Sequence, residues 1–222
     1  MKLSKSQSIA VGTLIILFGL IIILSHYFLG KKTQLFELVN MQYYFSQVEE
    51  EILPEEPVEP EVPVEPEVPV EPEQPVEEKP KEPVITESYI AVLEIPKIDL
   101  KKGIYKIGSK YNTVSRNVAI LTPSDYPDVV GGNFVLAAHS GNGYLSFFKN
   151  LYKLNNGDVA YIFYNNIKYT YKISYIYTQP KVGTINVYRP YGKTTLMLIT
   201  CTKNDNTTQT VYVAELIATE NA

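Results

Sequence analysis

The stretch at residues 194–201 reads Thr-Thr-Leu-Met-Leu-Ile-Thr-Cys, and an earlier stretch at residues 133–139 reads Asn-Phe-Val-Leu-Ala-Ala-His. Both are short apolar runs of strand length, and each ends on a side chain that can do chemistry. Cys201 is the only cysteine in the 222-residue chain, and His139 is the only histidine after residue 83. A thiol and an imidazole that meet at strand ends are the minimum for thiolate nucleophilic catalysis. The alternative is that both are ordinary core residues.

The sequence around these runs has the pattern of β-structure, rich in Val, Ile, Tyr and Thr with turn residues at short intervals. Strands are expected at residues 89–94, 118–121, 133–138, 158–163, 168–178, 194–201 and 209–219, and a short helix at residues 145–151. The continuously apolar run at 133–138 predicts burial on both faces. Asn165-Asn166 indicates a hairpin. Alternation places five residues on one face of the following strand: Tyr169, Tyr171, Ile173, Tyr175 and Tyr177. Seven or eight short strands with little helix predict a closed or nearly closed β-barrel.

Charge divides the chain into parts of different character. Residues 49–83 hold fourteen Glu, two Lys and ten Pro, a net charge of −12, whereas residues 84–222 carry +5. Only the last ~139 residues have the size and composition of a packed domain. We therefore divide the chain into an N-terminal tip and anchor (1–32), a juxtamembrane segment (33–48), an extended spacer (49–83) and a folded domain (84–222). The lysine excess of the domain is too diffuse to indicate nucleic-acid binding.

The N-terminus is predicted to be a single membrane-spanning helix. No charge interrupts residues 9–30, and about 20 helical residues cross a ~30 Å hydrocarbon core. A cleaved signal peptide is the alternative, but its apolar region is shorter, about 7–15 residues, and it ends at small residues that are missing here. The terminal amine gives the N-terminal side a slight excess of positive charge, which favours a cell-membrane protein whose folded domain is extracellular. The following residues 33–48 are apolar at loosely helical spacing.

The acidic segment contains a six-residue repeat, Pro-Val-Glu-Pro-Glu-Val, three times over residues 57–74, with Gln as the last residue. Proline at every third residue fixes φ and removes amide donors, which excludes helix and sheet. Polyproline II rises ~3.1 Å per residue, so residues 49–83 would reach on the order of 100 Å. We interpret the segment as a standoff from the membrane; a plain disordered linker is the alternative.

These runs, in this order, resemble the sortases, the cysteine transpeptidases that attach surface proteins to Gram-positive cell walls. The resemblance covers roughly residues 88–218. It includes Ile-Ala-Val-Leu-Glu-Ile-Pro (90–96) as a first strand, and Gly-Gly-Asn-Phe-Val-Leu-Ala-Ala-His (131–139), where sortases carry their catalytic histidine. Leu-Ile-Thr-Cys (198–201) is similar to the Thr-Leu-x-Thr-Cys strand end of the family, with Met197 where the family usually has Thr. The anchor, the spacer and a single barrel also fit the family.

The resemblance implies a sortase-like barrel in which Cys201 is the nucleophile and His139 the acid and base. Cys201 would attack a backbone carbonyl in a C-terminal sorting signal of the LPXTG type, and an amine would resolve the thioacyl-enzyme. The expected partners are surface proteins that bear this signal, and an amine from a cell-wall precursor or a pilin lysine. No cofactor is expected. Calcium binds some sortases, but four acids are scattered singly among turn residues and are expected to be caps and turn formers: Asp125, Asp128, Asp158 and Asp205.

One position departs from the family, which places an arginine at the start of the strand after the cysteine. Gln209 stands at that position, and its amide could still donate to an oxyanion, although without a charge. Arg189, Lys203 or backbone amides are the alternatives for this role. The loop at residues 180–192 is the candidate wall of an apolar substrate groove, through Val182, Ile185 and Val187, unless those side chains only cover the core.

Two rival functions stay open. Because of Gln209, the domain could be a sortase-like binding or assembly module without turnover. It could also be another extracellular cysteine enzyme, such as an L,D-transpeptidase or an endopeptidase. Those enzymes commonly carry His-Gly-Cys, or a cysteine that precedes the histidine, and this chain has neither.

Overall fold

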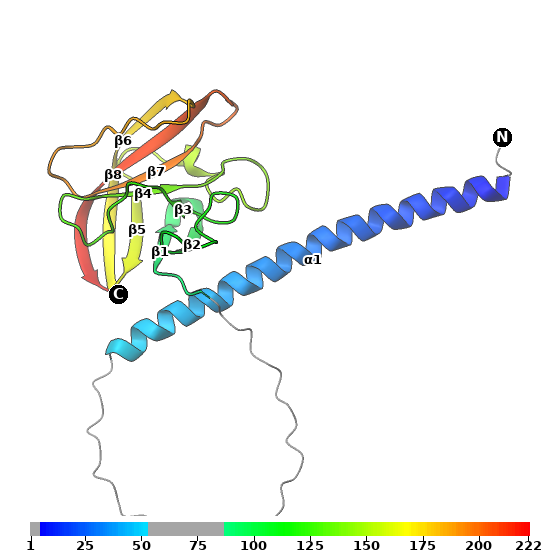
Figure 1. Cartoon of the computed structure of the whole chain (residues 1–222), viewed down its shortest axis with the longest axis horizontal. Coiled ribbons are helices and arrows are strands. Elements are labelled where there is room, and N and C mark those ends of the chain that lie inside the picture. Colours follow the sequence, from blue (N-terminus) through cyan, green and yellow to red (C-terminus); the bar gives the residue numbers. More distant parts are fainter. Residues whose placement is uncertain (1–4, 53–86) are drawn as a thin grey trace, which may run out of the picture.

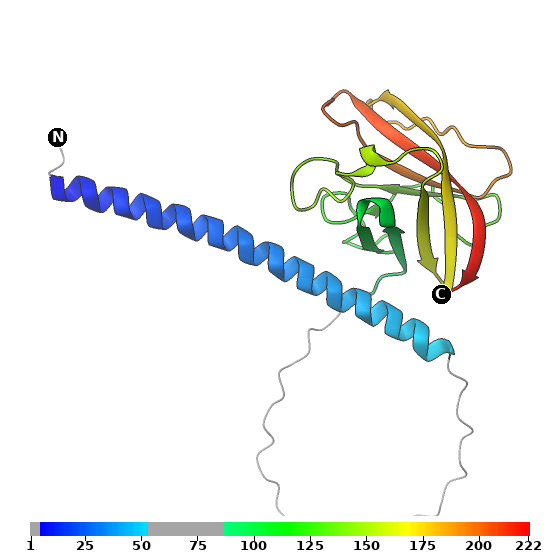
Figure 2. The same cartoon turned by 180° about the vertical axis from the view of Figure 1, so that it is seen from behind.

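The computed structural model describes residues 5–52 and 87–222. This part of the chain forms one long helix, α1 (Lys5–Ile52), and a β-rich body that lies against the second half of the helix (Figure 1, Figure 2). The helix passes without a break through the segment 33–48. Most of the expected spacer, including its repeat, lies outside the described residues.

Eight strands in a single sheet make up the body. They are β1 (Ala91–Ile95), β2 (Leu100–Ile104), β3 (Ala119–Ile120), β4 (Asn133–Ala137), β5 (Val159–Tyr164), β6 (Ile167–Pro180), β7 (Thr195–Cys201) and β8 (Thr208–Asn221). The order across the sheet is β2-β1-β5-β6-β8-β7-β4-β3. Only β4 and β7 pair in parallel among these strands. The sheet curls into a nearly closed barrel, which confirms the predicted mostly-β fold (Figure 1).

Two elements differ from those expected. The sequence does not indicate β2, because two lysines and a glycine interrupt its apolar residues. Residues 145–151 do not form the expected helix; they form turns that lead into a short 3-10 helix, η2 (Leu151–Lys153). The buried side chains here are Phe148, Leu151 and Leu154, and a spacing of three residues matches one turn of a 3-10 helix. A second 3-10 turn, η1 (Pro96–Ile98), follows β1.

The tyrosine-rich strand β6 does not keep its five alternating residues on one face. Tyr169, Tyr171 and Ile173 are buried in the main core, as alternation predicts. The register against β8 then shifts between Ile173 and Tyr175, which is a β-bulge. The extra residue reverses the faces beyond it, so Tyr175 is exposed and Tyr177 packs on the opposite side of the sheet.

Strand β7 is buried on both faces because it lies between two apolar clusters. Leu196 and Leu198 belong to the main core inside the barrel. Met197 and Ile199 belong to a second cluster on the other face, with residues from β4 and β8. We call this second cluster, made of Val135, Ala137, Met197, Ile199, Val211 and Val213, the outer cluster. The expected burial of the run at 133–138 is confirmed, since all five residues of β4 are buried.

The second half of α1 packs on the barrel through aromatic residues. Tyr44 is 8% exposed and belongs to a buried cluster with Tyr89, Val92 and Tyr105. Its hydroxyl donates a hydrogen bond of 3.1 Å to the carbonyl of Phe163. Burial, and then the neighbouring Tyr164, raise the pKa of Tyr44 to about 12, so the phenol is neutral at physiological pH. The helix is therefore attached to the barrel by packing as well as by the chain.

An ion pair joins the helix to β2. The Lys102 ammonium, 3% exposed, binds the Glu37 carboxylate of α1 and lies 3.9 Å from the centre of the Phe147 ring. Burial lowers the pKa of Lys102, and the Glu37 charge partly opposes that effect. A buried lysine needs such a partner, because an unpaired charge in the interior is costly. The pair therefore specifies where on the helix the barrel sits.

The turn between β7 and β8 is held by Asp205. Its carboxylate accepts hydrogen bonds from the Thr207 hydroxyl (2.6 Å), the Thr208 hydroxyl (2.6 Å) and the Thr207 backbone amide (2.8 Å). These bonds, that of the Thr207 hydroxyl first, lower the pKa of Asp205 to about 2. Asp205 is thus a turn former, as expected.

Tyr44→Ala is expected to release the helix from the barrel, whereas Tyr43→Ala on the same helix is not. Tyr43 is 41% exposed and Tyr44 is 8% exposed, and truncating a buried aromatic costs about 3–5 kcal/mol. Hydrogen–deuterium exchange of residues 37–46 in the full chain measures the effect. Equal protection in the two variants would contradict the described packing.

The Asp205 turn is expected to loosen at acidic pH. The folded-state pKa of about 2 lies below the ordinary value of 3.8, so the carboxylate stabilises the turn above about pH 4 and loses this effect as the pH falls through about 2. NMR of the Thr207 amide should follow that change. In Asp205→Asn the amide should exchange faster at neutral pH and show no acid transition.

Candidate functional site

The parallel pair β4 and β7 brings His139 and Cys201 to neighbouring positions at one edge of the sheet. Ala137 lies opposite Ile199 in the register, and His139 and Cys201 each follow two residues later. A step of two residues returns to the same face of a strand, so both side chains point to the side of the outer cluster. Adjacent strands lie about 4.8 Å apart. The predicted meeting of the two residues therefore has a simple structural basis.

Hydrogen bonds on either side of His139 extend the pairing with β7 beyond the end of β4. The Thr200 hydroxyl donates to the Ala138 carbonyl at 2.8 Å, and the Ser140 hydroxyl donates to the Cys201 carbonyl at 2.8 Å. The His139 carbonyl accepts a bond of 2.9 Å from the Phe148 amide. The backbone around His139 is thus fixed against the end of β7.

His139 and Cys201 line the same open cavity, which has a volume of about 500 Å³. His139 is exposed and Cys201 is partly exposed. The cavity is also lined by residues from three segments: Ser140, Gly141, Asn142, Lys149, Asn150, Tyr152, Thr202, Lys203, Asn204 and Asn206. A cavity of this size admits a segment of peptide, and a partly exposed thiol beside an imidazole can attack a carbonyl placed there.

Gln209 lies directly opposite Cys201 on the neighbouring strand β8. Its side-chain amide donates a hydrogen bond of 3.1 Å to the carbonyl of Thr184 in the loop between β6 and β7. Gln209 is absent from the lining of the cavity that His139 and Cys201 share. Gln209 is therefore at the position next to Cys201 that the sequence predicts. Its side-chain amide, however, donates to the Thr184 carbonyl of the loop.

The three apolar residues predicted to wall the groove, Val182, Ile185 and Val187, have different surroundings in the structure. Ile185 packs against the outer cluster, so it covers the floor formed by β4, β7 and β8. Val182 and Val187 are 73% and 48% exposed. None of the three lines the cavity of His139 and Cys201.

The two alternative cations, Arg189 and Lys203, have other partners. The Arg189 guanidinium donates to the carbonyls of Gly131 (2.8 Å) and Gly132 (3.0 Å), which precede β4 at the end far from Cys201. Lys203 lines the cavity, and its ammonium lies 3.3 Å from the centre of the Tyr152 ring. A hydrogen bond from Lys203 is the largest cause that lowers the pKa of Tyr152, against the opposing effect of desolvation.

The sequence does not indicate three residues that the structure places around the thiol. Ser140 and Tyr152 line the cavity, and the Lys181 ammonium donates to the Cys201 sulfur at 3.3 Å. Lys181 follows β6, and the path of that loop cannot be read from residue spacing. A polar residue directly after His139 is the only available signal, and it points to Ser140.

Three of the four acids considered as metal ligands, Asp125, Asp158 and Asp205, accept hydrogen bonds or pair with a lysine. Asp125 accepts from the Asn133 amide, and Asp158 pairs with Lys97 at 2.7 Å. Within residues 5–52 and 87–222, no group of three or more His, Cys, Asp or Glu residues could hold a metal ion.

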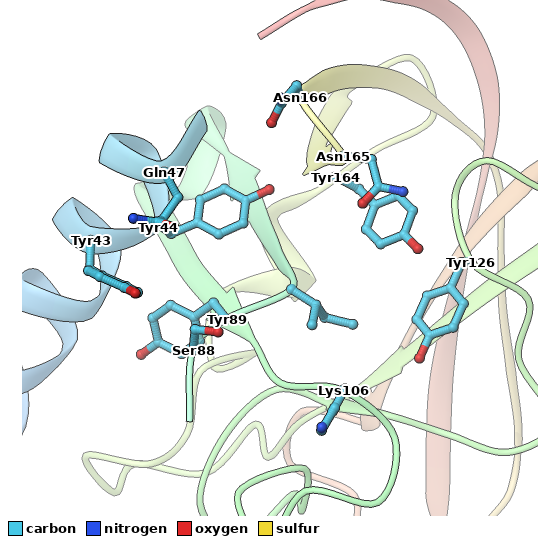
Figure 3. Close-up of a pocket in the computed structure, with 11 residues that line it drawn as sticks. Tyr43, Tyr44, Gln47, Ser88, Tyr89, Lys106, Tyr126, Tyr164, Asn165 and Asn166 are labelled. Atoms are coloured by element: carbon cyan, nitrogen blue, oxygen red, sulfur yellow. The ribbon is translucent and has the colours of Figure 1, made fainter. Parts of the chain in front are cut away.

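A second cavity of about 440 Å³ lies between α1 and the barrel. Figure 3 shows Tyr43, Tyr44 and Gln47 entering from the helix, with Tyr126 and Tyr164 on the barrel side. The hairpin of β5 and β6 borders this cavity. Ile167, the first residue of β6, pairs with Asn221 at the end of β8. Cys201 pairs with Gln209 at the beginning of β8, so the two cavities lie at opposite ends of the strand.

Solved structures and a curated protein share this fold or sequence. Sortase C1 from Streptococcus agalactiae is 25% identical, with a TM-score of 0.52 over 59% of this chain and 68% of its own. Sortase A from Corynebacterium diphtheriae is 26% identical, with a TM-score of 0.53 over 60% and 62% of the two chains. Sortase A of Bacillus anthracis is 25% identical over 132 residues, which span 59% of this chain and 61% of that relative.

Sortases A and C match to a similar extent, so the likeness is to the domain that these enzymes share. A family model described as the sortase domain matches residues 93–217, more than half of the chain. The matched region contains the whole of β4 and β7 together with His139 and Cys201. With the barrel described above, this match shows that the chain belongs to the sortase family.

Proposed function

We propose that this chain is a membrane-anchored cysteine transpeptidase that cleaves a C-terminal sorting signal and transfers the protein to an amine. The observation that carries the proposal is the shared cavity of Cys201 and His139 at the ends of two paired strands. The cleaved signal would be of the LPXTG type, and the amine would come from a cell-wall precursor or a pilin lysine. Membership of the sortase family supports both assignments.

In this mechanism Cys201 passes its thiol proton to His139, and the thiolate attacks the peptide carbonyl carbon. The new S–C bond pushes the carbonyl electron pair onto oxygen. When the tetrahedral oxyanion collapses, the C–N bond breaks and the leaving amine takes the proton from His139. An incoming amine then loses a proton to His139, attacks the thioester and displaces the Cys201 sulfur. No cofactor takes part in these steps.

The surroundings of the thiol supply the proposed substrate groove. The outer cluster gives an apolar floor behind Cys201, covered by Ile185. Val182 and Val187 are exposed on the same loop and would form its wall. For Gln209 to serve the oxyanion, its amide would have to leave the Thr184 carbonyl. In the state described, Gln209 holds the loop instead.

The proposed anchor is the N-terminal half of α1. Val11–Leu29 is long and apolar enough to cross a membrane, with a mean hydropathy of 2.3. With the N-terminus inside the cell, the barrel would lie outside, where surface proteins and cell-wall precursors meet. The division into anchor (1–32), juxtamembrane segment (33–48), spacer (49–83) and catalytic domain (84–222) is part of this proposal.

The full chain in detergent, incubated with quenched LPXTG-type peptides and an amine, is expected to release the fluorophore and form an acyl adduct on Cys201. Cys201→Ala should abolish the adduct in mass spectrometry. His139→Gln should slow turnover by roughly 10²–10⁴-fold, because the proton transfers lose their carrier. His26→Gln is the matched control, because it makes the same change in the helix far from the cavity.

Peptide binding without any adduct would replace the proposal with a binding or assembly module. Turnover that survives Cys201→Ala would remove the mechanism altogether. The amine dependence of the product separates transfer from hydrolysis.

A further inference from the structure

The Cys201 sulfur has a cation on the side opposite to His139. Across the sheet the order is β6-β8-β7-β4, so His139, after β4, and Lys181, after β6, approach β7 from opposite directions. The Lys181 ammonium lies 3.3 Å from the Cys201 sulfur, within hydrogen-bonding distance. The thiol therefore contacts an ammonium and shares its cavity with an imidazole.

The position of Lys181 is built by the strands that precede it. Pro180 pairs with Thr208, and the Lys181 amide donates to the Thr207 carbonyl at 2.8 Å, which continues the ladder. One step earlier, Gln179, Gln209 and Cys201 form a row across three strands. Lys181 follows Gln179 by two residues and lies on the same face as that row. Its side chain reaches the sulfur diagonally across β8.

The loop that begins at Lys181 is tied down at several points. The Gln179 side chain, which is buried, accepts from the Asn186 amide at 2.9 Å. Gln209 binds the Thr184 carbonyl, and the Tyr177 hydroxyl donates to the Asn186 carbonyl at 2.6 Å. These bonds hold the loop a few residues after Lys181, and the bond from the Lys181 amide to the Thr207 carbonyl holds its own backbone.

No other cation in the described parts of the chain lies within hydrogen-bonding distance of the sulfur. Arg189 is bound at the other end of β4, Lys203 lies over the Tyr152 ring, and Gln209 carries no charge. Lys149 lines the cavity but does not hydrogen-bond to the sulfur. The contact between Lys181 and Cys201 is thus a specific feature of the site and does not reflect a general excess of lysine.

We propose that Lys181 is a further catalytic residue: its ammonium stabilises the Cys201 thiolate and then the oxyanion, in place of the missing arginine. The thiol proton goes to His139, and Lys181 keeps its own proton throughout. As the S–C bond forms, negative charge leaves the sulfur and appears on the carbonyl oxygen, and the flexible lysine side chain follows it. This role rests on the proposed transpeptidase function.

Alkylation of the full chain in detergent with neutral iodoacetamide at pH 7 tests whether Lys181 stabilises the Cys201 thiolate. This test needs no peptide. Cys201 is the only cysteine, so the adduct reports on it alone. Lys181→Met and Lys181→Gln should alkylate roughly tenfold more slowly, because the thiolate loses its nearest positive charge. Lys181→Arg should stay within about threefold of the native rate. Lys172→Met, which removes an exposed lysine from β6, the strand that leads to Lys181, should have no effect.

Peptide turnover tests whether Lys181 stabilises the oxyanion. If it does, kcat/KM should fall by about 10²–10³-fold in Lys181→Met. Because Lys181 is exposed, thermal unfolding of the variants should match that of the native chain. Equal alkylation rates in Lys181→Met and Lys172→Met would overturn the inference, even where the native chain processes peptides. A native chain that processes no peptide but shows the alkylation difference would instead refute the transpeptidase proposal and leave the Lys181–thiolate contact standing.

Discussion

The parallel register of β4 against β7 carries His139 and Cys201 to the same edge of the sheet and to the same face. A slip by one residue would turn one of the two side chains to the other face. The register is fixed because both strands are buried on both sides: Leu136 and Leu198 lie in the main core, while Ala137 and Ile199 lie in the outer cluster. The Thr200 hydroxyl adds a bond to the Ala138 carbonyl just before the site. Packing of hydrocarbon thus determines the distance between two reactive groups.

The strands β4 and β7 are regular, whereas the two polar side chains near the thiol come from segments that lie just beyond strand ends. His139 stands at the point where β4 ends, and Lys181 at the point where β6 gives way to a loop. Their backbones are held by bonds from Phe148 and to Thr207. The sulfur thus lies between two polar groups that have separate supports. A change in one support need not disturb the other, which would let the cation vary in sequence position while the nucleophile and the imidazole stay in place.

Much of this arrangement can be predicted from the sequence, because apolar runs and turn residues act locally. The runs that end at His139 and Cys201 and the hairpin at Asn165-Asn166 are strands and a turn in the structure; both asparagines have positive φ, as that hairpin requires. The failures depend on long-range contacts. β2 contains Lys102, which is buried and pairs with Glu37 of a helix distant in sequence. The bulge before Tyr175 and the reach of Lys181 to the sulfur depend on neighbouring strands. Likewise, spacing locates Gln209 but not the carbonyl that its amide binds.

The attachment of α1 to the barrel also bears on how far the active site would stand from a bilayer. Tyr44, late in the helix, and Tyr89, at the start of the barrel chain, lie in one buried cluster. Glu37 follows Leu29, the last residue of the apolar span, by about 12 Å of helix. The height of the barrel above a bilayer would then be set by that helical distance.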